Sequence, residues 1–136
     1  MSDGESKGVS SAKRFVVLEH HASHLHWDLR LEIDGVLKSW AVPKEPPSQP
    51  NIRRLAVEVE DHPLSYIDFE GVIEEGQYGA GAVKIWDRGT YSLESRKPEK
   101  LVFELRGGKL TGRYTLVRFT DNPKNWLFFK TKMPSQ

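Results

Sequence analysis

Strict alternation of apolar and polar residues is the feature that most constrains this fold. Residues 25–33 read Leu-His-Trp-Asp-Leu-Arg-Leu-Glu-Ile, so each large apolar side chain is followed by a polar one. Successive side chains of a β-strand point to opposite faces of a sheet, and the segment therefore predicts a strand with one apolar and one polar face. The following Asp34-Gly35 predicts a two-residue hairpin, because both central residues of a type I′ turn need positive φ.

The same alternation recurs in residues 55–59 and 83–85, with breaks at Pro-, Gly- and Asn-containing segments between the apolar runs. No long segment has a helical period, although residues 94–101 or the segment after His62 could form a short helical turn. The spacing predicts an all-β protein: a small antiparallel barrel or sandwich of about eight strands with at most short helices. We interpret the glycine-rich residues 76–81 as a turn, since no Gly-Lys-Ser/Thr ending follows.

Length and composition indicate one domain and exclude several kinds of site. The chain has 136 residues, of which we expect 1–13 to be a flexible tail and 14–136 to be a single domain. No run of 18 apolar residues and no signal-peptide pattern is present, so we expect an intracellular protein. The absence of cysteine excludes disulfides, thiolate metal sites and cysteine nucleophiles. Any metal must therefore be bound by His, Asp, Glu or water.

Charge is distributed unevenly along the chain. Residues 1–75 carry 8 Lys/Arg and 14 Asp/Glu, a net charge of −6, whereas residues 76–136 carry 12 and 5, a net charge of +7. A basic half is compatible with a polyanionic partner and equally with ordinary solvated strand faces.

Histidines and one carboxylate cluster at the first strand. His26 and Asp28 lie two residues apart on its polar face, where they can bind one ion, and His20 could be the third ligand if the chain turns across residues 21–25. An isolated His-x-Asp pair is usually only hydrogen-bonded, but four of the five histidines fall within residues 20–26. Two imidazoles and one carboxylate suit Mn²⁺, Fe²⁺, Co²⁺ or Zn²⁺.

Arginines and a separate histidine accompany this cluster. Arg30 continues the polar face, and Arg54 opens the strand whose apolar positions are Leu55, Val57 and Val59. Guanidinium groups bind phosphate oxygens in a two-pronged geometry, although surface ion pairs are an equally good explanation. His62 ends that strand and could donate a proton or act as a base. A metal, arginines and a histidine together indicate phosphoryl hydrolysis.

A series of short motifs gives the chain a close resemblance to one family. They are Arg14-Phe15-Val16-Val17, His20, and residues 25–32, 35–44, 54–57, 60–66, 69–71, 76–81 and 85–89. In order and spacing they strongly resemble the 3′-phosphoesterase module of bacterial ATP-dependent DNA ligase D and its stand-alone relatives, from about residue 14 to 132.

The resemblance implies an end-healing enzyme of non-homologous end joining with a small antiparallel barrel fold. Such a module uses a divalent metal, typically Mn²⁺. It resects a 3′-terminal ribonucleotide and then removes the 3′-phosphate, leaving a 3′-hydroxyl for ligation. The metal ligands of the family fall on His20, His26 and Asp28. Its other active-site residues fall on Arg30, Lys44, Arg54, His62 and Tyr66.

The implied partners are DNA or DNA–RNA primer-template 3′ ends, with no membrane. Since no ligase or polymerase module is present in these residues, we expect a separate ATP-dependent ligase and end-joining factors, and a cytoplasmic, nucleoid-associated protein. The short tail before residue 14 makes removal of the phosphate the more direct expectation than the ribonuclease step. One residue conflicts with the strand pattern. A hairpin at Asp34-Gly35 pairs residue i with residue 69 − i, which sets Lys44 opposite Leu25 on the apolar face, unless Pro43 breaks the register.

Two alternatives remain open. His26, Asp28 and His62 also have the form of the facial triad of a non-haem iron oxygenase. A non-catalytic nucleic-acid-binding barrel would instead use the basic half of the chain, with Trp86, Tyr91 or Trp126 stacking on bases, unless these aromatics belong to the core.

Overall fold

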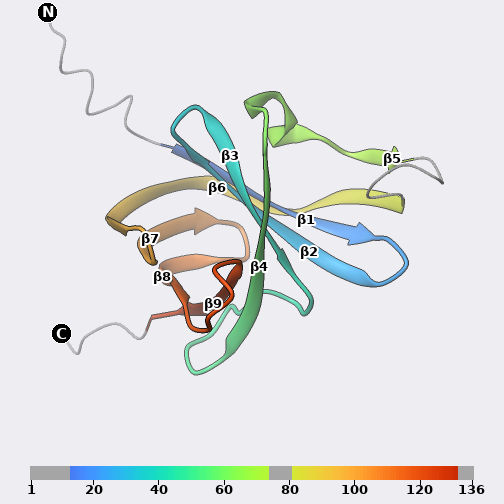
Figure 1. Cartoon of the computed structure of the whole chain (residues 1–136). Coiled ribbons are helices and arrows are strands. Elements are labelled where there is room, and N and C mark those ends of the chain that lie inside the picture. Colours follow the sequence, from blue (N-terminus) through green and yellow to red (C-terminus); the bar gives the residue numbers. More distant parts are fainter. Residues whose placement is uncertain (1–12, 74–80, 132–136) are drawn as a thin grey trace, which may run out of the picture.

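Nine antiparallel strands and one short 3₁₀ helix make up the part of the chain that the computed structural model describes, residues 13–73 and 81–131 (Figure 1). The strands are β1 (Lys13–His21), β2 (Leu25–Ile33), β3 (Val36–Val42), β4 (Arg53–His62), β5 (Gly71–Ile73), β6 (Gly81–Lys97), β7 (Lys100–Gly107), β8 (Thr111–Arg118) and β9 (Asn125–Lys130). The 3₁₀ helix η1 (Leu64–Asp68) follows β4.

Eight of these strands close into a barrel. The hydrogen-bonded order is β1-β2-β3-β4-β9-β8-β7-β6, and pairing of β6 with β1 completes the circle. The ninth strand, β5, adds to the beginning of β6 outside the barrel. Closure leaves no long unpaired edge in the described barrel strands. The prediction of a small antiparallel barrel of about eight strands is therefore confirmed.

The turn between β2 and β3 has the geometry that its sequence predicts. Asp34 and Gly35 adopt φ angles of 57° and 81°, both positive as a type I′ turn requires. Ile33 pairs with Val36, and the register continues without a shift as far as Trp27 and Val42. Residue i therefore faces residue 69 − i along this hairpin, as expected.

The barrel interior is filled by alternate residues of every barrel strand, many of them aromatic. Its fully buried members include Phe15, Leu29, Leu31, Trp40, Tyr91, Phe103, Tyr114 and Phe128. On β4 the inward residue is Ala56, which faces Trp126 of β9. Leu55 is 39% exposed, so the prediction that Leu55, Val57 and Val59 form the buried face of this strand is wrong. A small residue is sufficient there because Trp126 and Phe128 occupy the space.

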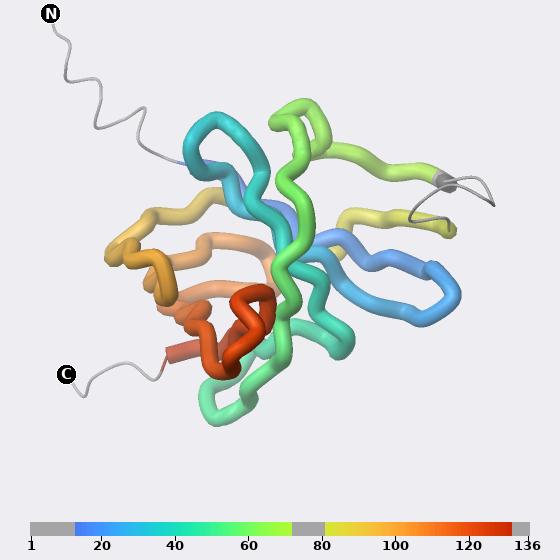
Figure 2. Tube along the Cα trace, in the orientation of Figure 1, coloured from blue at the N-terminus to red at the C-terminus, as the bar shows by residue number. Residues whose placement is uncertain are grey.

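A second apolar cluster lies on the outer face of the barrel. Val16 and Leu18 of β1 and Leu37 of β3 point away from the interior and are covered by Ile67 of η1. Figure 2 shows the chain leaving β4 through η1 and returning along β5 beside β6. The 3₁₀ helix η1 therefore covers part of the outer face of β1, β2 and β3, and polar side chains beneath it are shielded from water.

A buried carboxylate fixes the turn between β7 and β8. Asp87 of β6 is 6% exposed, and its two oxygens accept hydrogen bonds from the backbone N–H groups of Gly108 and Leu110, each at 2.8 Å. Both N–H groups would otherwise lack a partner at the turn, so Asp87 stabilises the hairpin locally.

Two expectations fall largely on residues that are not described. The flexible tail predicted for residues 1–13 lies outside the described residues except for Lys13, which begins β1. The turn predicted at residues 76–81 likewise lies outside them except for Gly81, the first residue of β6. Within the described segments, no helix has the length and apolar character needed to cross a membrane.

Candidate metal centre

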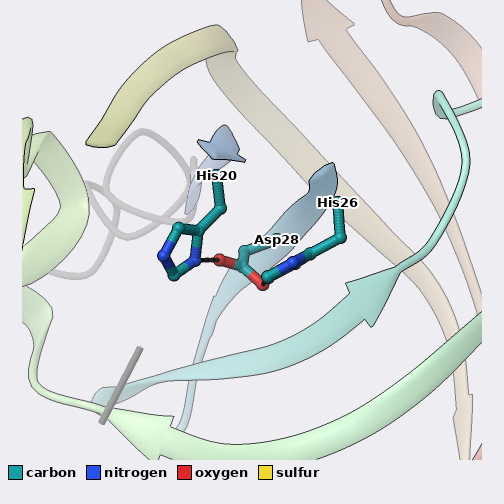
Figure 3. A group of neighbouring side chains, drawn as sticks. All are labelled: His20, His26 and Asp28. Carbon is teal, nitrogen blue, oxygen red and sulfur yellow. Dashed lines mark ion pairs between the residues drawn. The ribbon is translucent and has the colours of Figure 1, made fainter. Parts of the chain in front are cut away.

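Three potential metal ligands meet where β1 and β2 join. His20 of β1 is directly opposite His26 of β2 in the antiparallel register, and Asp28 follows on the same face of β2. Small residues between the strands allow the chain to turn back over a short connection. One ligand atom from each residue lies within 4.8 Å of the others. Figure 3 shows both imidazoles beside the Asp28 carboxylate.

The carboxylate lies between the two imidazoles. Asp28 Oδ2 is 3.4 Å from His20 Nδ1, and Asp28 Oδ1 is 3.2 Å from His26 Nε2. His20 and Asp28 are buried, at 7% and 9% exposure, whereas His26 is half-buried and faces solvent. Of the three residues, His26 is therefore the most accessible to solvent.

The electrostatic environment keeps Asp28 ionised. Burial by itself raises the pKa of this carboxyl, but hydrogen bonds from His20 and His26 outweigh burial, and with the nearby Arg30 charge they hold the pKa well below its usual range. The hydrogen bond with Asp28 raises the pKa of His26, against the opposing effect of burial. The ionised Asp28 carboxylate between the two imidazoles therefore makes this site attractive to a cation.

The donor set fits a divalent first-row metal. His26 Nδ1 lies 3.3 Å from the carbonyl oxygen of His24, and a carbonyl only accepts, so Nδ1–H donates to it. The proton that His26 Nε2 shares with Asp28 is therefore the one that a metal ion would replace. Metal-binding histidines usually have their second nitrogen fixed in this way. Two imidazoles with one ionised carboxylate form a mixed site suited to Mn²⁺, Fe²⁺, Co²⁺ or Zn²⁺.

A buried arginine, Arg30, follows Asp28 on the same face of β2. Arg30 is 8% exposed and faces Ser39 across the β2–β3 pair. Its Nε and Nη1 atoms have no hydrogen-bond partner within the described residues, and Nη2 lies 3.5 Å from His62 Nε2. Burial lowers the pKa of Arg30, and Asp28 opposes this effect. A buried guanidinium with unused donors is unfavourable alone and is suited to receiving an anion.

His62 reaches this site because β4 contains a bulge. The pairing of β3 with β4 shifts between Leu37 and Ser39, which turns His62 to the outer face, on the same side as Ser39. Burial and the Arg30 charge lower the pKa of His62, so its ring is neutral near pH 7. Tyr66 of η1 lies beside it, with ring centroids 5.9 Å apart, and is 42% exposed.

One contact of this site was not anticipated from the sequence. Ser39 Oγ lies 3.0 Å from His62 Nδ1, and Ser39 is 1% exposed. The predicted hairpin register, in which residue i faces residue 69 − i, already sets Ser39 opposite Arg30. The register was therefore the signal that could have placed Ser39 next to this site. A single serine on the polar face of a strand does not by itself indicate a functional contact.

Lys44 and Arg54 lie together, away from His62. They line a shared surface hollow with Pro43, and Arg54 Nε donates to the Glu45 carbonyl at 2.7 Å. Lys44 follows the end of β3 and is exposed, so the pairing with Leu25 that would bury it does not form.

Arg54 is the second and His62 the last residue of β4, so eight residues of extended strand separate them, at most roughly 26 Å at about 3.3 Å per residue. Arg54 also shares the face of Ala56, whereas the bulge turns His62 to the other face. The structure therefore does not bring Arg54 to the Arg30–His62 pair.

The geometry disfavours both alternative functions. The compact group contains His20 rather than the His62 that the facial-triad reading needs. Tyr91 and Trp126 are buried in the core, at 0% and 3% exposure, and cannot stack on bases. Trp86 is half-buried beneath the Lys109 ammonium, 4.6 Å from its ring. Several basic residues of the C-terminal half are paired with acidic residues of this chain. The ion pairs are Arg88–Asp68, Arg96–Asp34, Arg106–Glu104 and Arg113–Glu94.

Comparison with known proteins agrees with the arrangement of this site. Residues 18–118 match the family described as the DNA Ligase D 3′-phosphoesterase domain. The chain belongs to this family. The matched range contains the three potential metal ligands (His20, His26 and Asp28), Arg30, His62 and Tyr66. Membership of this family identifies the protein as a phosphoesterase.

Curated relatives share about half of the residues over most of the chain. The multifunctional non-homologous end joining protein LigD of Pseudomonas aeruginosa is 51% identical over 133 residues, or 93% of this chain. The multifunctional non-homologous end joining DNA repair protein LigD of Mycobacterium tuberculosis is 48% identical over 122 residues, or 87% of this chain. The chain spans only 16% of the length of each relative.

Proposed function

We propose that this chain is a divalent-metal-dependent enzyme that removes a 3′-phosphate from DNA ends. The observation that carries the proposal is the buried Arg30, with unused donors, beside an ionised His/His/Asp group. One side offers a cation site and the other an anion site, the combination that hydrolysis of a phosphate monoester requires. Family membership supports the choice of a 3′-phosphoesterase over other phosphatases.

His20, His26 and Asp28 would hold the metal, for which we propose Mn²⁺ or another divalent first-row ion. A bound divalent ion supplies positive charge that polarises the phosphate and lowers the pKa of water. Asp28 is already ionised, and the hydrogen bond of His26 to His24 fixes the nitrogen that would bind. These three residues therefore need little rearrangement to accept a cation.

Arg30 would bind the phosphate through donors that have no other partner in the described chain. Its position two residues after Asp28 on one strand face keeps the anion site next to the cation site. Tyr66, exposed beside His62, is suited to contacting the terminal nucleotide. We propose that Lys44 and Arg54 contribute positive charge farther along the DNA strand, not at the reacting phosphate.

The reaction needs one proton removed and one delivered. An oxygen of water attacks phosphorus, the bond between phosphorus and the 3′ oxygen breaks, and the leaving oxygen takes the electron pair and a proton to become the 3′-hydroxyl. The attacking water loses a proton, and inorganic phosphate is the second product. His62, neutral and next to Arg30, is suited to moving this proton at Nε2.

The relatives are named for non-homologous end joining, and we propose the same setting for this chain. Its substrates would be primer-template 3′ ends, including ends that carry a terminal ribonucleotide, which the enzyme would resect first. A separate ATP-dependent ligase would seal the 3′-hydroxyl that it leaves. Such work would take place in the cytoplasm, on the nucleoid.

The proposal is tested with three duplexes of one sequence. One carries a 3′-phosphate on the primer strand, one a 3′-terminal ribonucleotide, and the control a 5′-phosphate. We expect Mn²⁺-dependent release of inorganic phosphate from the first, shortening of the second and no reaction of the third. Folded protein that releases no 3′-phosphate, or that removes the 5′-phosphate equally well, would contradict the proposal.

A further inference from the structure

A buried serine connects β3 to the histidine of the proposed reaction. Ser39 lies on the outer face of β3 and is 1% exposed. Its hydroxyl oxygen is 3.0 Å from the carbonyl oxygen of Leu37 and 3.0 Å from His62 Nδ1. Both neighbours are therefore within hydrogen-bond distance of a single hydroxyl group.

The number of protons determines the direction of both bonds. A serine hydroxyl has one proton, and a backbone carbonyl can only accept, so the Ser39 hydroxyl donates to Leu37. Its oxygen is then available to His62 only as an acceptor, which requires a proton on Nδ1. A neutral imidazole has one N–H, and Nε2 is consequently left with a lone pair.

The other ring nitrogen has an environment that agrees with this assignment. His62 Nε2 faces Arg30 Nη2 at 3.5 Å, and a guanidinium group only donates. A proton on Nε2 would point at another donor and leave Ser39 Oγ without its bond. Two residues on different strands thus require the same tautomer, and Ser39 makes the shorter contact.

We propose that Ser39 is a positioning residue that holds His62 in the Nδ1-protonated tautomer, so that Nε2 enters the reaction as a proton acceptor. The catalytic part of this inference rests on the function proposed above. Nε2 takes a proton from the attacking water, the water oxygen forms its bond to phosphorus, and the 3′ oxygen leaves with the electron pair of the broken bond. The proton then passes from Nε2 to the leaving oxygen, which restores neutral His62.

The tautomer is measured directly by long-range ¹H–¹⁵N NMR of protein labelled at histidine nitrogens, with chelator present. The chain has five histidines, and the signals absent from a His62→Asn variant identify His62. We expect a protonated Nδ1 and a non-protonated Nε2 in the wild type. A protonated Nε2 in the neutral ring would overturn the inference, and this result needs no variant at Ser39.

A Ser39→Ala variant tests the catalytic consequence. We expect the wild-type tautomer to give way to a mixture, and kcat for 3′-phosphate release to fall by roughly ten- to a hundredfold with KM little changed, because general acid–base catalysis contributes about 10²–10⁴-fold in total. The control is Thr115→Ala, which removes another buried hydroxyl, that of Thr115 on β8, which is bonded to Thr131 just after β9. We expect it to leave kcat unchanged.

The results separate the two proposals. Ser39→Ala protein that keeps both the wild-type tautomer and the wild-type kcat would overturn the role of Ser39. An equal loss of kcat in both variants would overturn it too, because a general loss of stability would then explain the effect. If folded wild type releases no phosphate, the proposed function fails, while the NMR spectrum of the wild type still decides the tautomer.

Discussion

Replacing Asp28 with asparagine removes the negative charge between His20 and His26 while nearly keeping the shape of the side chain. Asp28 lies 3.4 Å and 3.2 Å from the two imidazoles and is the only carboxylate of this group. The pKa of Asp28 is held below its usual range, so the residue is fully charged at neutral pH. An amide oxygen keeps the position of a ligand but not its charge, and we expect metal binding to be largely lost.

The expected magnitude follows from linkage. A ligand at about 100 times its Kd stabilises the folded state by about 2.7 kcal/mol, which raises the Tm of a domain of this size by roughly 8–10 °C. Changing a residue that only supports a metal ligand commonly weakens affinity by about 10–100-fold, so losing the charged ligand should weaken it by at least about 100-fold. At the same metal concentration the variant is then stabilised by only about 0.4 kcal/mol, or roughly 1–2 °C.

The assay is thermal unfolding with and without Mn²⁺, each variant being compared with its own metal-free Tm. Asp34→Asn is the matched control, since Asp34 is an exposed aspartate at the tip of the next turn and its carboxylate bonds, among the described residues, only to Arg96. It should keep the wild-type shift. An equal metal-induced shift in Asp28→Asn and wild type would refute the assignment of Asp28 as a ligand.

Three further predictions concern the site and the barrel. Mn²⁺ affinity, measured by calorimetry, should fall from about pH 8 to pH 6, because the raised pKa of His26 makes protons stronger competitors for Nε2; equal affinity at both would contradict this. Arg30→Lys should lower kcat/KM for phosphate release by about 10²–10³ without unfolding the protein, and a change below about threefold would count against Arg30 as the phosphate ligand. Asp87→Ala should lower the free energy of unfolding by about 2–5 kcal/mol in urea titrations, because the N–H groups of Gly108 and Leu110 lose their acceptor; an unchanged midpoint would exclude that role.

The hairpin of β2 and β3 and much of the metal group could be predicted because their determinants are local. The alternation along residues 25–33 fixes which side chains share a face, and Asp34-Gly35 fixes the register of the next strand. His20 needed only a short turn to lie opposite His26, and the register shows that pairing. The catalytic and ligand roles themselves stay predictions.

The faces of β4 could not be read from its alternation alone. Large apolar residues at 55, 57 and 59 suggested the inner face, but the interior beside β4 is already filled by Trp126 and Phe128, so that Ala56 fits. The bulge that turns His62 outward depends on pairing with β3, a partner that the sequence of β4 does not specify.

The covering of the polar face of β2 by η1 could not be predicted from the sequence pattern either. The sequence predicts that the segment after His62 could form a short helical turn, and η1 forms there, but the pattern does not show that η1 covers the outer cluster through Ile67. As a consequence Arg30, which the alternation places on a polar face, is buried. Its burial is what makes its unused donors informative, and only the tertiary structure shows it.

The most direct test of the central claim is release of inorganic phosphate from a primer-template duplex with a 3′-phosphate. Wild type and His26→Ala are compared with Mn²⁺, with Mg²⁺ and with chelator, after both are shown to be folded. We expect release by the wild type with Mn²⁺, none with chelator, and a loss of nearly all activity in His26→Ala. Release that persists in chelator, or that His26→Ala leaves unchanged, would contradict a metal-dependent phosphoesterase built on this group.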